Sequence, residues 1–300
     1  MPSRTVRSSV PSRDEVMAQA DSGERPVRRT AEGRAGLAAI RREPARALIA
    51  TDFDGTLSPI VADPREARAD PGAVAGLRGL AGLVGTLAVI TGRPAAEAVE
   101  LGGFDGILGL IVLGHYGLER WEEGAVTAPP VPPGVAAARE RLPGVLAGTG
   151  GLEGVRIEDK GSALAVHTRR AADPAGALAA LRGPLAELAA DVGLTVEPGR
   201  LVIELRPPGM DKGAALTSLV AERKAGPVLF AGDDLGDLAA FGAVRALRGE
   251  GHPGVTVCSA SGEVSELAAE ADLVVDGPGG VAALLGSLAR SLSPPPHPAR

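Results

Sequence analysis

The segment Ala47-Leu-Ile-Ala-Thr-Asp-Phe-Asp-Gly-Thr-Leu-Ser-Pro-Ile60 decides the fold of this chain. Its apolar start predicts a short buried strand, and two acids, Asp52 and Asp54, follow where that strand ends. Residues two apart on extended backbone project to the same side, and an open parallel sheet binds ligands outside the carboxyl ends of its strands. Two neighbouring carboxylates repel each other, and a hard cation such as Mg²⁺ relieves that repulsion. Gly55 then permits a sharp turn.

Length, composition and charge restrict the class of protein. A chain of 300 residues is long enough for one large domain or two smaller ones with a sizeable core. Aromatic residues make up only 2%, so the core must consist of Ala, Leu and Val, and base stacking is disfavoured. The net charge of −6 also argues against a nucleic-acid partner. An anionic substrate would therefore need local cations in the site.

Cysteine use and hydropathy bear on the compartment. Cys258 is the single cysteine, so no intrachain disulfide is possible, and a reducing, cytoplasmic setting is expected. No run approaches the length of a membrane span, and the arginine-rich N-terminus has no apolar stretch behind it, so we expect neither a membrane partner nor a secretory signal. We expect a monomer that acts on a small molecule.

Apolar runs alternate with Ala/Leu-rich helical stretches along most of the chain. This pattern predicts βαβ units and a doubly wound, Rossmann-like α/β core with a parallel sheet, formed by residues 46–120 and 209–290. The expected strands are 47–51, 86–91, 110–114, 228–232, 254–258 and 272–275, and the expected helices are 72–84, 94–101, 212–224, 235–245, 262–270 and 279–290.

Residues 121–208 show a different pattern of predicted helices and strands, which predicts a smaller α+β cap domain inserted into the core. A proline-rich connector, residues 129–133, is followed by helices 134–148 and 174–192 and strands 154–158, 162–168, 194–197 and 200–206. Two polar end segments, 1–45 and 291–300, are expected to be disordered tails, although residues 34–43 favour a short helix.

Reactive side chains follow predicted strands or begin predicted helices at four separated points. The first point is the pair Asp52 and Asp54. The second is Thr91-Gly92-Arg93, where a hydroxyl and backbone N–H groups at a helix start suit an oxyanion. The third is Lys212, one of only three lysines, and the fourth is the acidic run Asp233, Asp234 and Asp237.

Phosphoryl transfer needs these chemical groups. It requires a nucleophile, a bridging metal, donors for the phosphate oxygens and an acid for the leaving oxygen. Asp52 suits the nucleophile, Asp54 the acid and later the base, and Thr91 and Lys212 the phosphate donors. The candidate metal ligands are the acids of both segments: Asp52, Asp54, Asp233, Asp234 and Asp237. Asp234 and Asp237 are also explained as helix-start acids that interact with the helix dipole.

The segment Asp52-Phe-Asp-Gly-Thr-Leu57, with Thr91, Lys212 and Gly232-Asp-Asp234, resembles the four motifs of the haloacid dehalogenase-like phosphatases. Within that superfamily, residues 46–285 are similar to the trehalose-6-phosphate phosphatase family. The narrower match rests on residues 58–60, 114–119, 158–161, 165–167, 204–207 and 209–216. The resemblance implies hydrolysis of trehalose 6-phosphate through an aspartyl phosphate at Asp52, with Mg²⁺ held by Asp52, the Asp54 backbone carbonyl and Asp233.

The resemblance also implies that the cap binds the sugar. Four of its side chains would face the sugar hydroxyls: Lys160, His167, Arg169 and Glu204. Gly92 and Arg93 would bind the phosphate end of the substrate. The chain departs from the family pattern at Tyr116, where the family usually has His, and at Gly236, Leu238 and Ala239, where it usually has Thr, Glu and Asp.

Three alternatives stay open at this point. In the first, the chain is a phosphatase of the same superfamily with another sugar phosphate or a phosphoglycerate-type substrate. In the second, it senses a phosphosugar with weak catalysis, and in the third it passes the phosphoryl group to a second sugar. Individual residues also have structural explanations: His167 as a satisfied structural histidine, and Glu204 as a residue on the solvated face of a strand.

Overall fold

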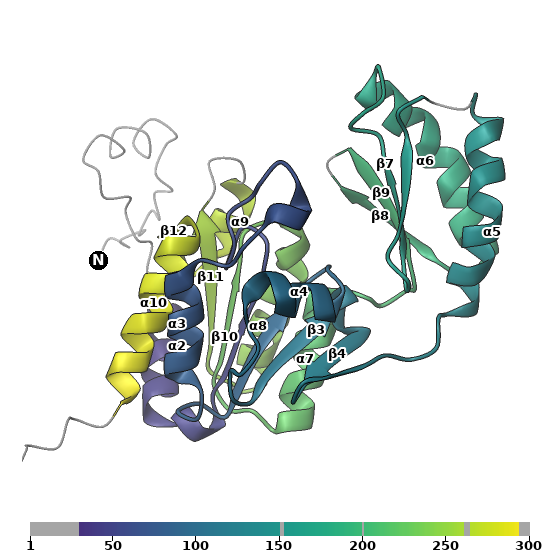
Figure 1. Cartoon of the computed structure of the whole chain (residues 1–300). Helices are drawn as coiled ribbons and strands as arrows, with labels where there is room; N and C mark the ends of the chain where they lie inside the picture. Colours follow the sequence, from purple (N-terminus) through teal and green to yellow (C-terminus); the bar gives the residue numbers. More distant parts are fainter. Residues whose placement is uncertain (1–29, 151–152, 200, 261–264, 294–300) are drawn as a thin grey trace, which may run out of the picture.

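The computed structural model describes residues 30–150, 153–199, 201–260 and 265–293, which form a core and a cap (Figure 1). An eight-stranded sheet in the order β12-β11-β10-β1-β2-β3-β4-β5 forms the centre of the core. Its strands are β1 (Leu48–Thr51), β2 (Thr86–Ile90), β3 (Leu110–Gly114), β4 (Glu119–Glu122), β5 (Ala125–Thr127), β10 (Val228–Gly232), β11 (Gly254–Ala260) and β12 (Leu273–Asp276). The pairs from β12 to β3 are parallel, whereas β4 and β5 add an antiparallel edge.

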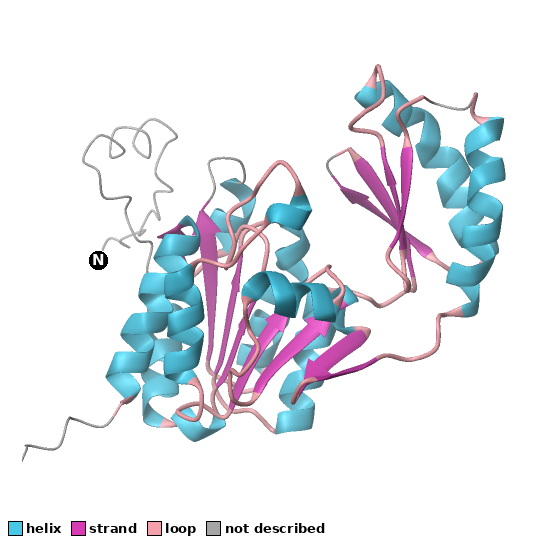
Figure 2. Cartoon of the chain, viewed as in Figure 1, coloured by secondary structure: helices cyan, strands magenta, loops and turns pink. Residues whose placement is uncertain are grey.

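Helices cover both faces of this sheet (Figure 2). One face packs against α2 (Ala31–Arg42), α3 (Pro71–Leu80), α4 (Ala95–Gly102) and α10 (Gly277–Leu292). The other face packs against α7 (Lys212–Arg223), α8 (Leu238–Gly249) and α9 (Ser265–Glu270). The strands between them are buried on both sides, which explains their continuous apolar runs. The predicted doubly wound α/β core is confirmed.

The cap has a four-stranded antiparallel sheet in the order β6-β7-β9-β8, backed by two helices. Its elements are α5 (Pro133–Gly148), β6 (Arg156–Asp159), β7 (Leu164–His167), α6 (Pro174–Asp191), β8 (Thr195–Gly199) and β9 (Val202–Arg206). In Figure 1 its sheet lies on the side toward the core and its helices on the outer side. Leu164, Val166, Ile203 and Leu205 pack with the helices. The alternate residues of β7 and β9 therefore lie on the side of the core.

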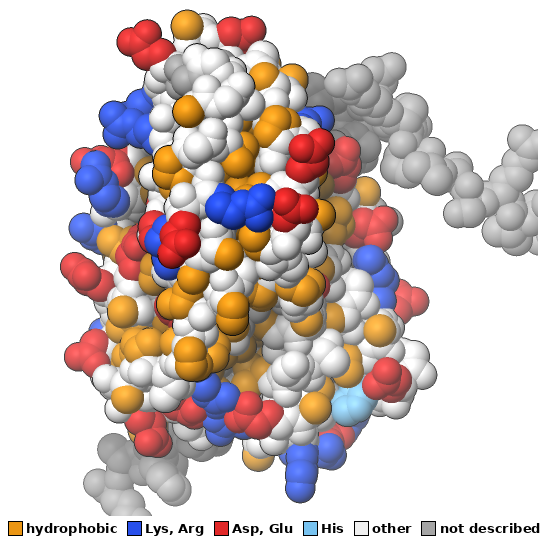
Figure 3. All heavy atoms as spheres, turned by 90° about the vertical axis from the view of Figure 1, so that its right-hand side faces the viewer, with side chains coloured by type: hydrophobic (Ala, Val, Ile, Leu, Met, Phe, Trp, Pro, Cys, Tyr) orange, Lys and Arg blue, Asp and Glu red, His pale blue; other side chains and the backbone are white. Residues whose placement is uncertain are grey.

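Figure 3 shows the outer side of the cap, where hydrophobic side chains are scattered among charged ones. The helices α5 and α6 are rich in alanine, and many of these alanines are at least partly exposed. Small apolar side chains spread over a surface in this way are ordinary for a folded protein. Among the described residues, no helix is both long enough and apolar enough to traverse a bilayer.

Two predicted boundaries are wrong at the edges of the core. The predicted tail 1–45 includes α2, whose Leu37 and Ile40 pack in the main hydrophobic core. These apolar residues lie three apart on one helical face, so burial outweighs the polar composition of the segment. The C-terminal tail is also shorter than predicted, because α10 continues to Leu292. Residues 1–29 and 294–300 of the two predicted tails lie outside the described residues.

The predicted start of the cap at residue 121 is also wrong. Strand β4 pairs with β3, and β5 pairs with β4, so the core sheet continues to Thr127. Trp121 in β4 is buried in the core. Glu123 and Gly124, between the two strands, both have positive φ, as a tight hairpin turn requires. The proline-rich connector follows β5 and leads into α5.

Candidate active site

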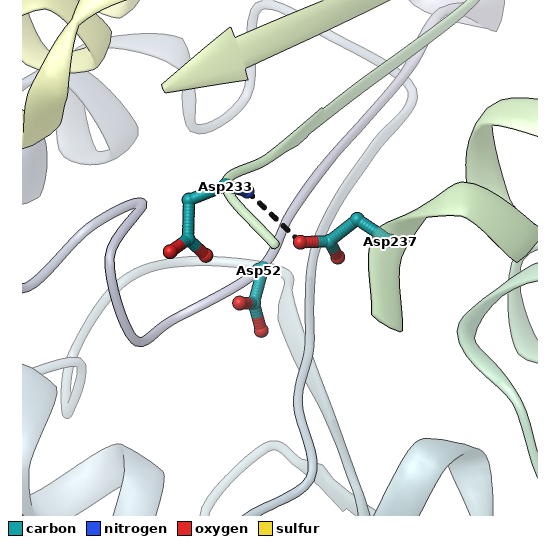
Figure 4. Close-up of side chains that lie close together, drawn as sticks. All are labelled: Asp52, Asp233 and Asp237. Carbon is teal, nitrogen blue, oxygen red and sulfur yellow. Dashed lines mark hydrogen bonds between the residues drawn. The ribbon is translucent and has the colours of Figure 1, made fainter. Parts of the chain in front are cut away.

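The carboxyl ends of β1 and β10 bring the two acidic segments together. These strands are parallel neighbours, so Asp52 after β1 and Asp233 after β10 lie side by side (Figure 4). One carboxylate oxygen each from Asp52, Asp233 and Asp237 lies within 4.8 Å of the others, and all three residues are buried. We call these three residues the acidic cluster. Asp237 comes from the short 3-10 helix η5 (Leu235–Asp237), and its Oδ2 accepts the Asp233 backbone N–H at 2.9 Å.

Lys212 supplies the positive charge of the site. Helix α7 begins at this residue because the Asp211 side chain caps it, accepting the Ala214 N–H at 2.8 Å. The ammonium group of Lys212 lies 2.9 Å from Asp52 Oδ1 and donates to Asp237 Oδ1 at 2.7 Å. Burial alone would lower the pKa of Lys212, but Asp237 and Asp52 hold it well above its ordinary value. The lysine is therefore charged and forms ion pairs with two of the three acids of the cluster, Asp52 and Asp237.

One ammonium group does not neutralise three buried carboxyl groups. Burial raises the pKa of Asp52 well above its ordinary value, and Lys212 offsets only part of this shift. Burial and the neighbouring Asp237 and Asp234 raise the pKa of Asp233 to about 8. A second cation would favour the ionised forms, and a set of donors made only of oxygen suits a hard divalent ion. The residues present therefore fit a divalent metal site.

A tight turn fixes the chain that follows Asp52. Gly55 has φ of +73°, and a Cβ atom at this position would lie 1.9 Å from the carboxylate of Asp233, so only glycine fits. The Ser259 hydroxyl donates to the Gly55 carbonyl at 2.7 Å. The Thr56 hydroxyl lies 3.5 Å from Asp233 Oδ1, to which it donates. The turn predicted at Gly55 is confirmed, and it packs directly against the acidic cluster.

Asp54, the predicted acid and base, lies outside the acidic cluster. Arg93 donates to its two carboxylate oxygens at 2.7 Å each, in a bidentate pair. The same guanidinium contacts Glu97 and lies 5.6 Å from the centre of the Phe53 ring. Arg93, predicted as a phosphate ligand, is thus bound to the predicted acid. The role of the Asp54 backbone carbonyl as a metal ligand stays a prediction.

Thr91 and Gly92 form the loop that follows β2. Thr91 is buried, and its hydroxyl oxygen accepts the Arg93 N–H at 3.2 Å. Helix α4 starts only at Ala95, one residue later than predicted, so the loop separates Thr91 from the helix end. Strand β2 pairs with β1, which places this loop at the same edge of the sheet as Asp52.

The predicted sugar-binding residues lie on two patches of the cap and in one turn. Lys160 Nζ lies 3.4 Å from Glu204 Oε1, and Glu204 is only 7% exposed, which excludes a solvated strand face for it. His167 Nε2 lies 2.7 Å from the carboxylate of Glu158, and this contact lowers the pKa of Glu158. Arg169 is exposed in the turn that follows β7.

The structure separates the two acids that the sequence left undecided. Asp237 belongs to the acidic cluster, whereas Asp234 is exposed and caps η5 by accepting the Gly236 N–H at 2.9 Å. Of the predicted metal ligands, the structure brings Asp52, Asp233 and Asp237 together. Asp234 fits the helix-start explanation, because its carboxylate accepts a backbone N–H of the first turn of η5.

Sequence reasoning gave no role to two side chains between the core and the cap, the half-buried Tyr116 and the buried Arg206. Tyr116 donates to Glu204 Oε2 at 3.4 Å, and the Arg206 guanidinium lies 4.5 Å from the centre of the Tyr116 ring. The signal for Arg206 was its position two residues after Glu204 on a strand, which puts both on one face. Tyr116 was visible only as a departure from the family pattern.

The doubly wound core with its inserted cap has the fold of the haloacid dehalogenase-like hydrolases, and the acidic cluster lies at the carboxyl edge of its sheet. A solved structure titled as such a hydrolase, from Bacteroides thetaiotaomicron, is 16% identical with a TM-score of 0.55 over 81% of this chain and 99% of that one, which supports the fold alone.

The chain belongs to the trehalose-phosphatase family. The model of that family matches residues 50–278. A trehalose-phosphate phosphatase of Mycobacterium marinum is 36% identical over 255 residues, which cover 81% of this chain but 61% of that protein. The chain thus spans less than two thirds of the length of this curated relative. The solved trehalose-6-phosphate phosphatase of Aspergillus fumigatus is 27% identical, with a TM-score of 0.63 over 86% of this chain and 97% of that one.

Proposed function

We propose that this chain is a Mg²⁺-dependent phosphatase that hydrolyses trehalose 6-phosphate to trehalose and phosphate. The observation that carries the proposal is the acidic cluster with Lys212, at the carboxyl edge of a sheet in a member of the trehalose-phosphatase family. The Mycobacterium marinum relative is named for this activity. Mg²⁺ is the ion chosen because it favours carboxylate and phosphate oxygens together.

Asp52 is the proposed nucleophile. Its carboxylate attacks phosphorus, a bond from Asp52 to phosphorus forms, and the bond from phosphorus to the sugar oxygen breaks. Lys212, at 2.9 Å from Asp52, orients this carboxylate and favours its ionised form. Asp52, Asp233 and the Asp54 carbonyl would hold Mg²⁺, with Asp237 beside them. Bound there, the ion would neutralise charge on the phosphate oxygens.

Asp54 is the proposed general acid and base. It gives a proton to the departing sugar oxygen and later takes one from the water that hydrolyses the aspartyl phosphate. To do so it must leave the bidentate contact with Arg93. Arg93 is then free to bind the phosphate, as is the Thr91 hydroxyl at the neighbouring strand end. One side chain would thus exchange partners between the free and the substrate-bound enzyme.

The cap is the proposed sugar site. Its sheet lies toward the core, and Lys160, His167 and Glu204 offer donors and acceptors for directional hydrogen bonds to sugar hydroxyls. Arg169 is included on the family resemblance. A cap over the acidic cluster would also keep water from the phosphoryl group until the sugar has left.

Phosphate release from trehalose 6-phosphate and from a panel of other sugar phosphates, with and without Mg²⁺, tests the proposal. We expect trehalose 6-phosphate to give the highest kcat/KM and turnover to require Mg²⁺. The variant Asp52→Asn should abolish turnover with its circular dichroism unchanged, and the exposed-acid variant Asp105→Asn should retain it. Appreciable turnover by Asp52→Asn would exclude Asp52 as the nucleophile. A sugar phosphate that is hydrolysed with a higher kcat/KM would replace trehalose 6-phosphate as the proposed substrate.

The variant Glu204→Ala tests recognition of the sugar separately from the chemistry. It should impair hydrolysis of trehalose 6-phosphate far more than hydrolysis of p-nitrophenyl phosphate, because only the first substrate reaches the cap. Equal losses on the two substrates would argue against a sugar contact at this residue.

A second candidate function, a phosphosugar sensor with weak catalysis, is favoured by one observation. Gly236, Leu238 and Ala239 stand where the family usually has Thr, Glu and Asp, so the segment after Asp233 carries fewer oxygen ligands. Binding of trehalose 6-phosphate without Mg²⁺-dependent turnover would support the sensor. Turnover at ordinary enzyme rates would dismiss it.

The proposed setting is the cytoplasm, where the chain acts as a monomer on its small-molecule substrate. The single, buried cysteine supports a reducing compartment. Light scattering of the purified chain tests the oligomeric state, and a mass of one chain is the expected result.

A further inference from the structure

The turn that follows β3 has an unusual backbone. In this turn, the 3-10 helix η4 (His115–Gly117), His115 has φ of +46° and Tyr116 has φ of +57°. Residues other than glycine rarely adopt this left-handed region, and they do so where the surrounding structure enforces it. Two backbone hydrogen bonds hold this left-handed conformation here. The Tyr116 N–H donates to the Thr91 carbonyl at 2.9 Å, and the His115 N–H donates to the Arg93 carbonyl at 2.9 Å. The turn is therefore fastened to the loop of Thr91 and Arg93.

The side chain of Tyr116 reaches from this core loop to the cap. A Cβ atom at Gly92 would lie 2.7 Å from the tyrosine hydroxyl, so the phenol packs directly on the loop after β2. The same hydroxyl donates to Glu204 Oε2 at 3.4 Å, and the ring stacks under Arg206 of the same cap strand. One side chain thus contacts both the proposed phosphate-binding loop and the cap strand β9.

Glu204 is held from two sides. Tyr116 donates to one oxygen and Lys160 lies 3.4 Å from the other, while the residue as a whole is 7% exposed. Burial and the negative charge of Glu204 raise the pKa of Tyr116, so the phenol stays protonated and acts as the donor. Each carboxylate oxygen still has a free lone pair, because a carboxylate accepts up to about four hydrogen bonds.

We propose that Tyr116 is a positioning residue that determines specificity for the sugar, and this inference rests on the proposed function. It fixes the carboxylate of Glu204 relative to the loop of Thr91 and Gly92. The sugar and the phosphate of one substrate are thereby recognised at a set separation. A phosphate ester without a sugar uses only the core and does not need this link.

The variant Tyr116→Phe removes only the hydroxyl and keeps the ring under Arg206. We expect KM for trehalose 6-phosphate to rise about tenfold, as for loss of one hydrogen bond to a charged group, with kcat within about twofold. For p-nitrophenyl phosphate, kcat/KM should change by less than about twofold. The control Thr149→Val removes a hydroxyl that donates to Leu146 O at the end of α5, and should change the hydrolysis of neither substrate.

A double-mutant cycle separates positioning from a general structural effect. In a Glu204→Ala background, Tyr116→Phe should have no further effect on trehalose 6-phosphate, because its partner is absent. The variant Tyr116→His carries the residue usual in the family and a donor, so it should recover most of the lost affinity. The midpoint of thermal unfolding should be the same for the wild type and Tyr116→Phe.

Three results would overturn the inference. They are an unchanged KM for trehalose 6-phosphate, equal losses on both substrates, and effects of Tyr116→Phe and Glu204→Ala that add fully. Each leaves the proposed function standing if the wild type still hydrolyses trehalose 6-phosphate. A wild type that hydrolyses p-nitrophenyl phosphate but no sugar phosphate would instead overturn the proposed function and this inference together.

Discussion

Replacing Asp233 by Asn should stabilise the metal-free protein at alkaline pH. Asp233 is buried in the acidic cluster, and its pKa in the folded chain is raised from 3.8 to about 8. Between these two pH values the unfolded chain has released a proton that the folded chain retains. Stability therefore falls as the pH rises from about 4 to about 8. Asparagine has nearly the same shape as aspartate and carries no charge, so it removes this loss.

The size of the effect follows from the same two values. Each pKa unit of difference between the folded and unfolded states is worth about 1.4 kcal/mol, so the full difference corresponds to about 6 kcal/mol. Asp52 and Asp237 remain in the variant, and part of the repulsion that raised the pKa of Asp233 remains between them. We therefore expect Asp233→Asn to raise the free energy of unfolding by about 3 kcal/mol at pH 8, and by less than about 0.5 kcal/mol at pH 4.

Urea unfolding followed by circular dichroism, in chelator and at both pH values, measures the effect. The control is Asp105→Asn, since Asp105 is an exposed acid outside the acidic cluster. Mg²⁺ at 1,000 times its Kd should reverse the order, because it adds about 4.1 kcal/mol to the wild type only. A variant no more stable than the wild type at pH 8 without metal would refute the repulsion inferred for the cluster.

Three further predictions concern the same site. Lys212→Met leaves Asp52 and Asp237 buried without their cation, so the free energy of unfolding in urea should fall by about 3–5 kcal/mol at pH 7 and by less at pH 4; a loss under about 1 kcal/mol at pH 7 would contradict the ion pairs. Gly55→Ala forces a Cβ against the carboxylate of Asp233 at a φ of +73°, so it should weaken Mg²⁺ binding in calorimetric titration and lower stability by about 1–3 kcal/mol; unchanged binding would speak against it. Chelation should stop phosphate release and added Mg²⁺ should restore it, whereas turnover that persists in chelator would exclude a metal-dependent reaction.

The convergence of Asp52 and Asp233 was predictable because it depends on backbone topology. Each acid follows an apolar run that is buried on both faces, and such runs become neighbouring parallel strands. The carboxyl ends of these strands meet at one edge, wherever the side chains point. Lys212 was predicted at the start of a helix, and in the structure the Asp211 cap fixes the start of α7 at this residue.

The contact between Asp54 and Arg93 was not predictable in this way. Both residues lie in loops, where the direction of a side chain depends on packing, here of the guanidinium on the Phe53 ring. The β4–β5 hairpin was missed for another reason. Its turn residues, Glu123 and Gly124, are a hairpin signal, but the prolines that follow led us to place the domain boundary before them.

The distribution of aromatic side chains has a practical consequence. Trp121 is the single tryptophan, buried in strand β4, and Tyr116, the single tyrosine, lies just before it in the turn that touches the cap. Indole emission from this chain therefore reports on one location in the core, at Trp121. Phenol emission reports on the junction of the core with the cap, at Tyr116. Detachment of the cap would alter the phenol signal while the indole stayed shielded, so two native fluorophores distinguish the melting of the core and of the cap without any attached dye.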